Sequence, residues 1–153
     1  NYEFLRSEVT QGINLYSPYH TISAENQDAR MAYLDLCAQL GIKVNYNVCS
    51  LAGSQGVGLN VKATPEEKYK ALKEEILRVK DHPALLSYYI ADEPDGQGVS
   101  PELLKQSYDL IHELDPYHPV SVVIISSLPA RRMTLSWQSL ILFRTLRQRK
   151  RPV

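Results

Sequence analysis

Two adjacent carboxylates, Asp92 and Glu93, end a largely apolar segment, residues 84–91. This segment predicts a buried strand, so at least one of the two carboxyl groups should lie beside the core and lose part of its hydration. Dehydration disfavours the ionised form, and such a carboxyl group can hold a proton near neutral pH and act as a general acid. The pair therefore marks the first candidate site for acid–base chemistry.

The alternation of side chains along a strand separates the two acids. Asp92 and Glu93 should point to opposite faces, so we expect only one of them to face a site. If that residue is Glu93, then Ser87, Tyr89 and Ala91 point to the same side below it. A structural alternative remains open, in which the Asp-Glu-Pro run is a turn whose carboxylates cap the next helix or accept backbone N–H groups.

Polar and aromatic side chains also follow two earlier apolar segments. Tyr16 and His20 lie at the end of the first segment, and Asn47 lies at the end of the second. Because parallel strands place their carboxyl ends at one edge, these side chains should gather near Asp92. Such groups suit the ring faces and hydroxyls of a sugar, although they also suit other polar ligands. Asp92, Asn47, Tyr16 and His20 are therefore candidate substrate-binding residues, and for His20 we favour the plainer interpretation of a loop histidine.

The elements that position these residues alternate along the chain. Apolar runs predict strands at residues 12–16, 42–48, 84–91 and 120–125, and helical periodicity predicts helices at about 24–40, 64–80 and 100–114. Thr64-Pro65 and Ser100-Pro101 combine an N-cap residue with a proline at the first helical position. With short connections and strands that are apolar on both faces, this order predicts parallel βα units. Periodicity alone does not separate a doubly wound sheet from part of a barrel.

One predicted helix and one predicted loop carry further expectations. In the helix at 24–40 the expected apolar face consists of Ala29, Tyr33, Leu36, Cys37 and Leu40, so Cys37 should be a buried free thiol. Residues 50–63 are rich in glycine and serine and follow a strand directly. They are either an exposed connector or a loop that shapes a substrate site.

Composition narrows the possible functions. The 153 residues fit one ordinary domain, and no apolar run approaches the roughly 18 residues of a membrane helix, so we expect no membrane span. No histidine or cysteine has metal-ligand spacing and no phosphate-binding glycine motif is present, so we expect neither a metal nor another cofactor. The sequence does not indicate an oligomeric state or a cellular location, and the first residues do not resemble a signal peptide.

The charge distribution divides the chain in two. The formal net charge is zero, yet residues 126–153 hold seven basic and no acidic residues, while residues 1–125 hold 10 basic and 17 acidic ones. Three interpretations of this basic tail compete: an arm for an anionic partner, an amphipathic helix, or out-of-frame or intron-derived residues. The abrupt change after a good strand favours the third, so we expect no nucleic-acid partner. We divide the chain into a domain at 1–125 and an atypical tail at 126–153.

The run Tyr88-Tyr-Ile-Ala-Asp-Glu-Pro-Asp95, after a helix and the break His82-Pro83, resembles the strand-four region of the glycoside hydrolase clan with (β/α)8 barrels. Residues 10–125 more closely resemble uncharacterised barrel proteins related to the family 2 catalytic domain. This resemblance implies an α/β fold, a partial (β/α)8 TIM barrel of about four βα units corresponding to barrel strands two to five. The chain is too short for a complete barrel, which needs at least about 200 residues.

The resemblance also implies a reaction, the hydrolysis of O-glycosidic bonds in a carbohydrate substrate, with Glu93 as general acid/base. Two features depart from the clan. Asp92 stands where the clan usually has asparagine, and the partner carboxylate that retaining enzymes need about 5–5.5 Å away lies on strand seven, beyond this chain. We therefore expect glycosidase activity in a longer parent protein and weak or no activity in this chain. The alternative is a non-catalytic carbohydrate-binding fragment or pseudoenzyme.

Overall fold

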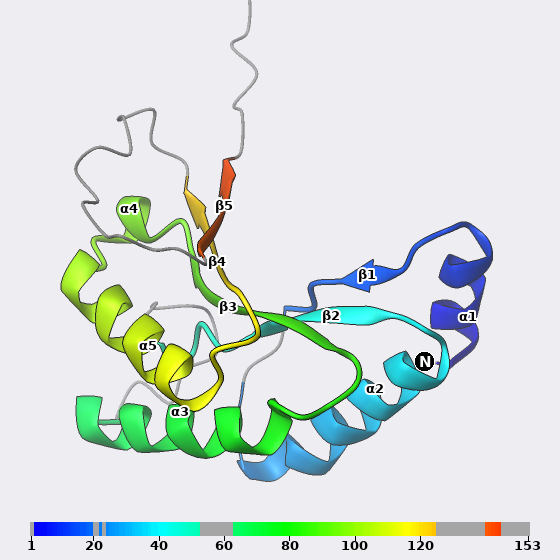
Figure 1. The fold of residues 1–153 in the computed structure, drawn as a ribbon, viewed down its shortest axis with the longest axis horizontal. Coiled ribbons are helices and arrows are strands. Elements are labelled where there is room, and N and C mark those ends of the chain that lie inside the picture. The colour runs from blue at the N-terminus through cyan, green and yellow to red at the C-terminus, as the bar shows by residue number, and fades with distance from the viewer. Residues whose placement is uncertain (1, 20–21, 23, 53–62, 125–139, 145–153) are drawn as a thin grey trace, which may run out of the picture.

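The computed structural model describes residues 2–19, 22, 24–52, 63–124 and 140–144. Its described strands form one parallel sheet in the order β1-β2-β3-β4-β5 (Figure 1). The strands are β1 (Leu15–Tyr16), β2 (Lys43–Asn47), β3 (Leu85–Asp92), β4 (Val120–Ile124) and β5 (Leu140–Arg144). The helices are α1 (Tyr2–Thr10), a 3-10 turn η1 (Ala24–Asn26), α2 (Gln27–Gln39), α3 (Pro65–Val79), α4 (Pro94–Gln97) and α5 (Pro101–Leu114).

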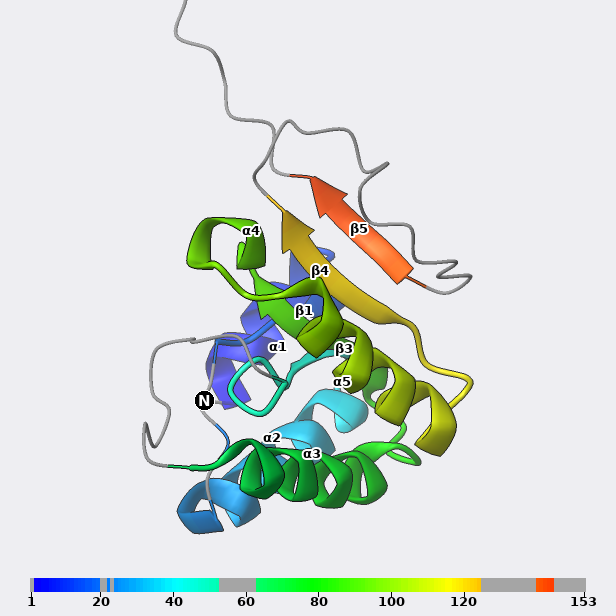
Figure 2. The same cartoon turned by 90° about the vertical axis from the view of Figure 1, so that its left-hand side faces the viewer.

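The strand order decides between the two parallel architectures. A doubly wound sheet reverses its strand order at a switch point and carries helices on both faces. Here every strand pairs with its predecessor along the chain, and the connecting helices α2, α3 and α5 lie along one face of the sheet (Figures 1 and 2). This is the arrangement of one segment of a (β/α)8 barrel, with the helices outside.

Local sequence signals set the ends of the two best-defined helices. The Thr64 hydroxyl accepts the Glu67 N–H at the start of α3, and the Glu67 carboxylate accepts the Thr64 N–H at 2.7 Å, which completes a capping box. The Ser100 hydroxyl accepts the Leu103 N–H at the start of α5. Both predicted helix starts are confirmed. The proline that follows each cap also matches the prediction.

The two faces of the sheet differ in polarity. The face that the helices cover carries apolar and aromatic side chains that are at most 2 % exposed. These side chains are Val44, Tyr46, Val48, Tyr88, Ile90, Val120 and Val122. The opposite face carries Asn45, Ser87 and Ser121, so the expectation that the strands are apolar on both faces is wrong. The Ser87 and Ser121 hydroxyls donate to Asn45 Oδ1 at 2.7 and 3.0 Å, a network that compensates for the burial of these polar groups.

Helix α2 buries most of the expected face: Cys37 is buried, and Tyr33, Leu36 and Leu40 are partly buried against the core. Ala29 is exposed, whereas Arg30, Leu34 and Cys37 are buried, with Cys37 a free thiol as predicted. Arg30 is buried because its guanidinium forms an ion pair with Glu75 of α3 at 2.9 Å. The Tyr46 hydroxyl of β2 donates to the same carboxylate at 2.5 Å. Hydrophobic periodicity misses the burial of Arg30 because arginine is usually a surface residue.

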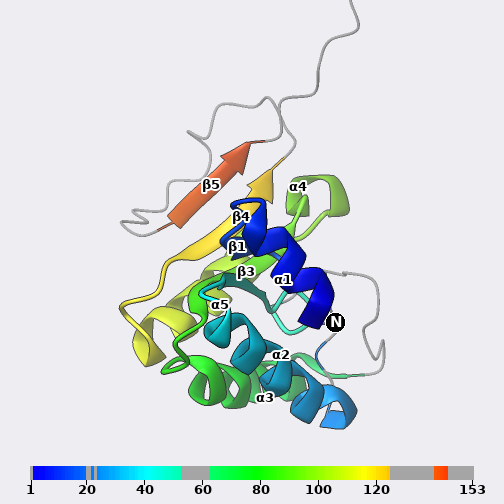
Figure 3. The same ribbon diagram turned by 90° about the vertical axis from the view of Figure 1, so that its right-hand side faces the viewer.

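The C-terminal part of the chain adds a strand where none was predicted. Residues Leu140–Arg144 form β5, which pairs in parallel with β4 at the edge of the sheet (Figure 3). The remainder of 126–153 lies outside the described residues, so the three interpretations of the basic tail stay open. None of the described helices is long and apolar enough to cross a membrane.

Candidate functional site

A break in strand register decides which acid faces the polar side of the sheet. Between β3 and β4, Tyr89 pairs with Ser121 and Ala91 pairs with Val122, so one extra residue, Ile90, is inserted in β3. Such a bulge reverses the side-chain alternation beyond it. Asp92 therefore shares the face of Ser87 and Tyr89, as its hydrogen bond to Tyr89 shows. The expectation that Ala91 points to this face is wrong, because its partner Val122 belongs to the helix-covered core.

Two tyrosines hold the Asp92 carboxylate. Tyr89 Oη donates to Asp92 Oδ1 at 2.6 Å, and Tyr19 Oη donates to Asp92 Oδ2 at 2.9 Å. Tyr19 follows β1, so the pair joins the ends of two strands that are not adjacent in the sheet. The two tyrosine rings meet edge to face with centroids 6.4 Å apart. Within the described part of the chain, no lysine, arginine or histidine pairs with Asp92, so phenols alone orient its carboxylate.

The pKa values of both tyrosines support this assignment of donors and acceptor. Burial raises the pKa of Tyr89, and the hydrogen bond to the Asp92 carboxylate raises it further. The pKa of Tyr19 is raised by loss of hydration at its hydroxyl and by the same carboxylate. Both phenols therefore remain protonated donors at neutral pH, and Asp92 acts as an acceptor.

Glu93 occupies an unusual backbone conformation directly after β3. Its φ of 48° and ψ of 46° lie in the left-handed region, which a residue with a side chain rarely adopts. Its N–H donates to Val123 O at 2.9 Å, which keeps the backbone tied to β4, and Pro94 then opens α4. Strain of this kind persists where the surrounding structure enforces it, and it is frequent at functional sites.

The Glu93 side chain has neither the burial that was expected of it nor the helix-capping role that the structural alternative gave it. It is exposed, so the expected dehydration beside the core is not found in this chain. It also makes no capping hydrogen bond to α4, although Glu93 stands at the N-cap position of that helix. Among the described residues its carboxylate has no hydrogen-bond or ion-pair partner, so it remains available to a ligand.

Asn47 brings a buried amide to the same face. It is 5 % exposed and pairs in register with Tyr89, and its Oδ1 accepts the Cys49 N–H at 3.0 Å. Its Nδ2 donates to none of the described residues. Burial and the nearby Asp92 charge raise the pKa of Cys49 to about 12, so this thiol is protonated at neutral pH and is a poor nucleophile.

Of the remaining predicted site residues, the structure describes Tyr16, which does not reach this place. Tyr16 pairs in register with Val44 of the helix-covered face, and its hydroxyl donates to Glu8 Oε2 of α1 at 3.1 Å. His20 and most of the glycine-rich loop at 50–63 lie outside the described residues. Tyr19 was missed as a site residue, although its place after the first strand was the available signal.

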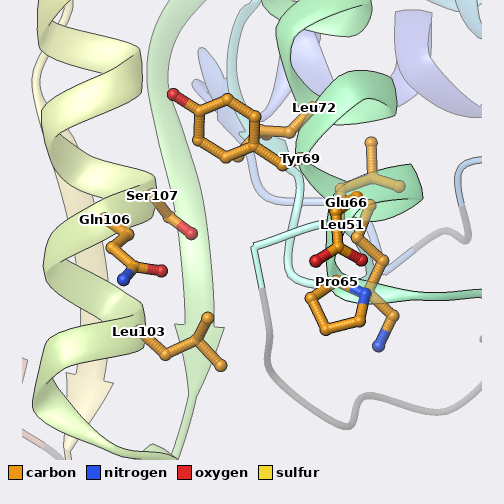
Figure 4. Close-up of a pocket in the computed structure, with 9 residues that line it drawn as sticks. Leu51, Pro65, Glu66, Tyr69, Leu72, Leu103, Gln106 and Ser107 are labelled. Atoms are coloured by element: carbon orange, nitrogen blue, oxygen red, sulfur yellow. The ribbon is translucent and has the colours of Figure 1, made fainter.

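A separate groove lies among the helices. It has a volume of about 510 Å³ and runs between α3 and α5, where Tyr69 and Leu72 face Leu103, Gln106 and Ser107 (Figure 4). None of the predicted site residues lines it. In the part of the chain that the structure describes, no three His, Cys, Asp or Glu side chains are grouped so that they could hold a metal ion.

Comparison with known proteins identifies the fold. No protein-family model matches the chain, and no curated protein matches it in sequence. Among solved structures, it is similar to Pseudomonas stutzeri endoglucanase Cel5A in complex with cellobiose, with a TM-score of 0.70 and 22 % identity over 93 % of this chain. A second structure of that endoglucanase gives 0.67 and 20 % over 93 %. The chain thus has the fold of part of a (β/α)8 barrel and spans about half the length of these proteins.

Proposed function

We propose that this chain forms part of a barrel that hydrolyses O-glycosidic bonds, with Glu93 as the general acid/base. The observation that carries the proposal is the position of Glu93, directly after β3 at the carboxyl edge of a parallel sheet, with a carboxylate that no described residue engages. In barrel enzymes the reacting groups lie at this edge. The similar endoglucanase binds cellobiose, which supports a β-linked glycan as the substrate.

In this proposal Glu93 and the residues around it have different roles in binding and cleavage. Glu93 donates its proton to the oxygen of the bond that breaks while a second carboxylate, which the described residues do not supply, bonds to the sugar. The Glu93 carboxylate then takes a proton from the water that displaces this second carboxylate. Asp92, held by Tyr19 and Tyr89, accepts hydrogen bonds from sugar hydroxyls. Asn47 donates from its buried amide. The exposed position of Glu93 requires that the bound sugar, or the other half of a complete barrel, removes water from its carboxyl group before it can serve as an acid.

A non-catalytic function has one observation in its favour. Glycoside hydrolysis uses two carboxyl groups that flank the bond, and the described ends of β1 and β2 carry none. Asp92 is adjacent to Glu93 and is held by two phenols, so it is a poor second carboxylate. The chain by itself could then bind a glycan without cleaving it.

Activity assays with a substitution at Glu93 test the proposal. A panel of aryl glycosides is assayed with the protein that carries the complete barrel, and with its Glu93→Gln variant. Loss of activity on the order of 10²–10⁴-fold with intact glycan binding is expected for a missing acid/base. Full activity in the variant would remove Glu93 from the mechanism. Binding of cello-oligosaccharides by the 153-residue chain without turnover would support the non-catalytic alternative for this chain.

A further inference from the structure

We infer that the site around Asp92 prefers a glycan that carries a protonated amine over a neutral or N-acetylated glycan of the same length. This inference rests on the proposed function and adds a substrate class to it. It depends on three features of the site: its charge, its aromatic ring faces and its pattern of donors and acceptors.

The first feature is uncompensated negative charge. Asp92 and Glu93 are neighbours, and among the described residues neither forms an ion pair. The described partners of the Asp92 carboxylate are the hydroxyls of Tyr19 and Tyr89, which orient it without neutralising it. A cationic group on the ligand would supply the missing opposite charge in a charge-assisted hydrogen bond.

The second feature is the aromatic surface beside the carboxylates. Tyr19 is 75 % exposed, and its ring meets that of Tyr89 edge to face. Aromatic faces attract ammonium groups electrostatically as well as the apolar face of a sugar ring. An amino sugar bound beside Tyr19 would therefore contact the aromatic rings with its ammonium group and with the apolar face of its ring.

The third feature is the division of donors and acceptors. Asp92 and ionised Glu93 only accept, whereas a protonated amine only donates. The donor on the protein side is the Asn47 Nδ2, which is buried, lies on the face of Tyr89 and has no described partner. It matches a hydroxyl or ring oxygen of the same ligand. N-acetylation removes the positive charge of the amine and adds bulk, so the site should not prefer an N-acetylated glycan.

Binding of three oligosaccharides of equal length tests the inference directly. The 153-residue chain is titrated calorimetrically with glucosamine, N-acetylglucosamine and glucose oligomers at about pH 6, where the sugar amine is protonated. We expect the glucosamine oligomer to bind roughly tenfold more tightly than the other two. The difference should shrink at about pH 9, where the amine is neutral, and at about 0.5 M salt.

Two matched substitutions separate the site from general attraction to an acidic surface. Asp92→Asn should reduce the preference to within about twofold, whereas Asp109→Asn, the same change at an exposed ion pair on α5, should leave it unchanged. Equal binding of the three oligomers by the wild-type chain would overturn the amine preference and leave glycan binding intact. A preference that persists in Asp92→Asn would also overturn it. Absence of any binding would count against the proposed function as well.

Discussion

Tyr89 and Asp92 form a 2.6 Å hydrogen bond although they lie three positions apart on one strand. In a regular strand residues at this spacing face opposite sides of the sheet. The extra residue Ile90 brings them to the same side, so the bulge in β3 is what places the Asp92 carboxylate beside the polar face of the barrel. The orientation of the candidate site therefore depends on one inserted residue.

Removal of the two phenol hydroxyls should have unequal effects on stability. Tyr89 is 3 % exposed and its hydroxyl donates to a charged acceptor, so Tyr89→Phe should lower the free energy of unfolding by about 1.5–3 kcal/mol. Tyr19 is mostly exposed, and water can replace its hydroxyl, so Tyr19→Phe should cost less than about 1 kcal/mol. Urea denaturation of both variants measures the difference. Equal losses would contradict the view that Tyr89 is the fixed member of the pair.

Loss of one partner of the buried ion pair between α2 and α3 should lower the free energy of unfolding far more than loss of one partner of a surface pair. Glu75→Gln leaves the Arg30 charge buried without its partner and should destabilise the protein by about 3–5 kcal/mol. The control is Glu74→Gln, which breaks the exposed pair with Lys70 and should cost less than about 1 kcal/mol. Thermal or urea unfolding compares the two. A Glu75→Gln variant as stable as Glu74→Gln would show that the Arg30 side chain is solvated.

How much of this could be read from the sequence depends on the residue. The order of the four predicted strands and three predicted helices, the two helix caps that a proline follows and the position of Glu93 after a buried strand follow from local patterns, which the structure confirms. The burial of Arg30 on α2 could not be read, because arginine is usually a surface residue unless a partner such as Glu75 faces it. The side on which Asp92 lies could not be read either, because nothing in the run Ser-Tyr-Tyr-Ile-Ala-Asp marks the bulge. Tyr19 reaches Asp92 only through the tertiary fold.

Asp115 should make stability depend on pH in the acid range. Burial opposes ionisation of this carboxyl group, but hydrogen bonds from Tyr88 and His118 outweigh burial and lower its pKa. A group whose pKa is lower in the folded state contributes stability above its unfolded-state value of about 3.9 and loses that contribution as the pH falls through the folded value.

This dependence can be measured with a matched pair of variants. The free energy of unfolding of Asp115→Asn should change less between about pH 5 and pH 3 than that of the wild type, because the variant has no carboxylate to protonate. Asp109→Asn, an exposed residue of α5, should retain the wild-type slope. Identical slopes in the wild type and Asp115→Asn would contradict the lowered pKa of Asp115.

The most direct test of Glu93 as an acid varies the leaving group of the substrate. The phenol of a phenyl glycoside needs a proton on its oxygen before it can leave. The 2,4-dinitrophenolate of a dinitrophenyl glycoside is a weak base and leaves readily without a proton. The values of kcat/KM for both substrates are compared between the complete barrel and its Glu93→Gln variant. The glutamine side chain can neither donate the proton nor carry a negative charge. We predict a loss on the order of 10²–10⁴-fold for the phenyl glycoside and a much smaller loss for the dinitrophenyl glycoside. Equal losses for the two substrates, or no loss for either, would contradict the assignment of Glu93 as the proton donor.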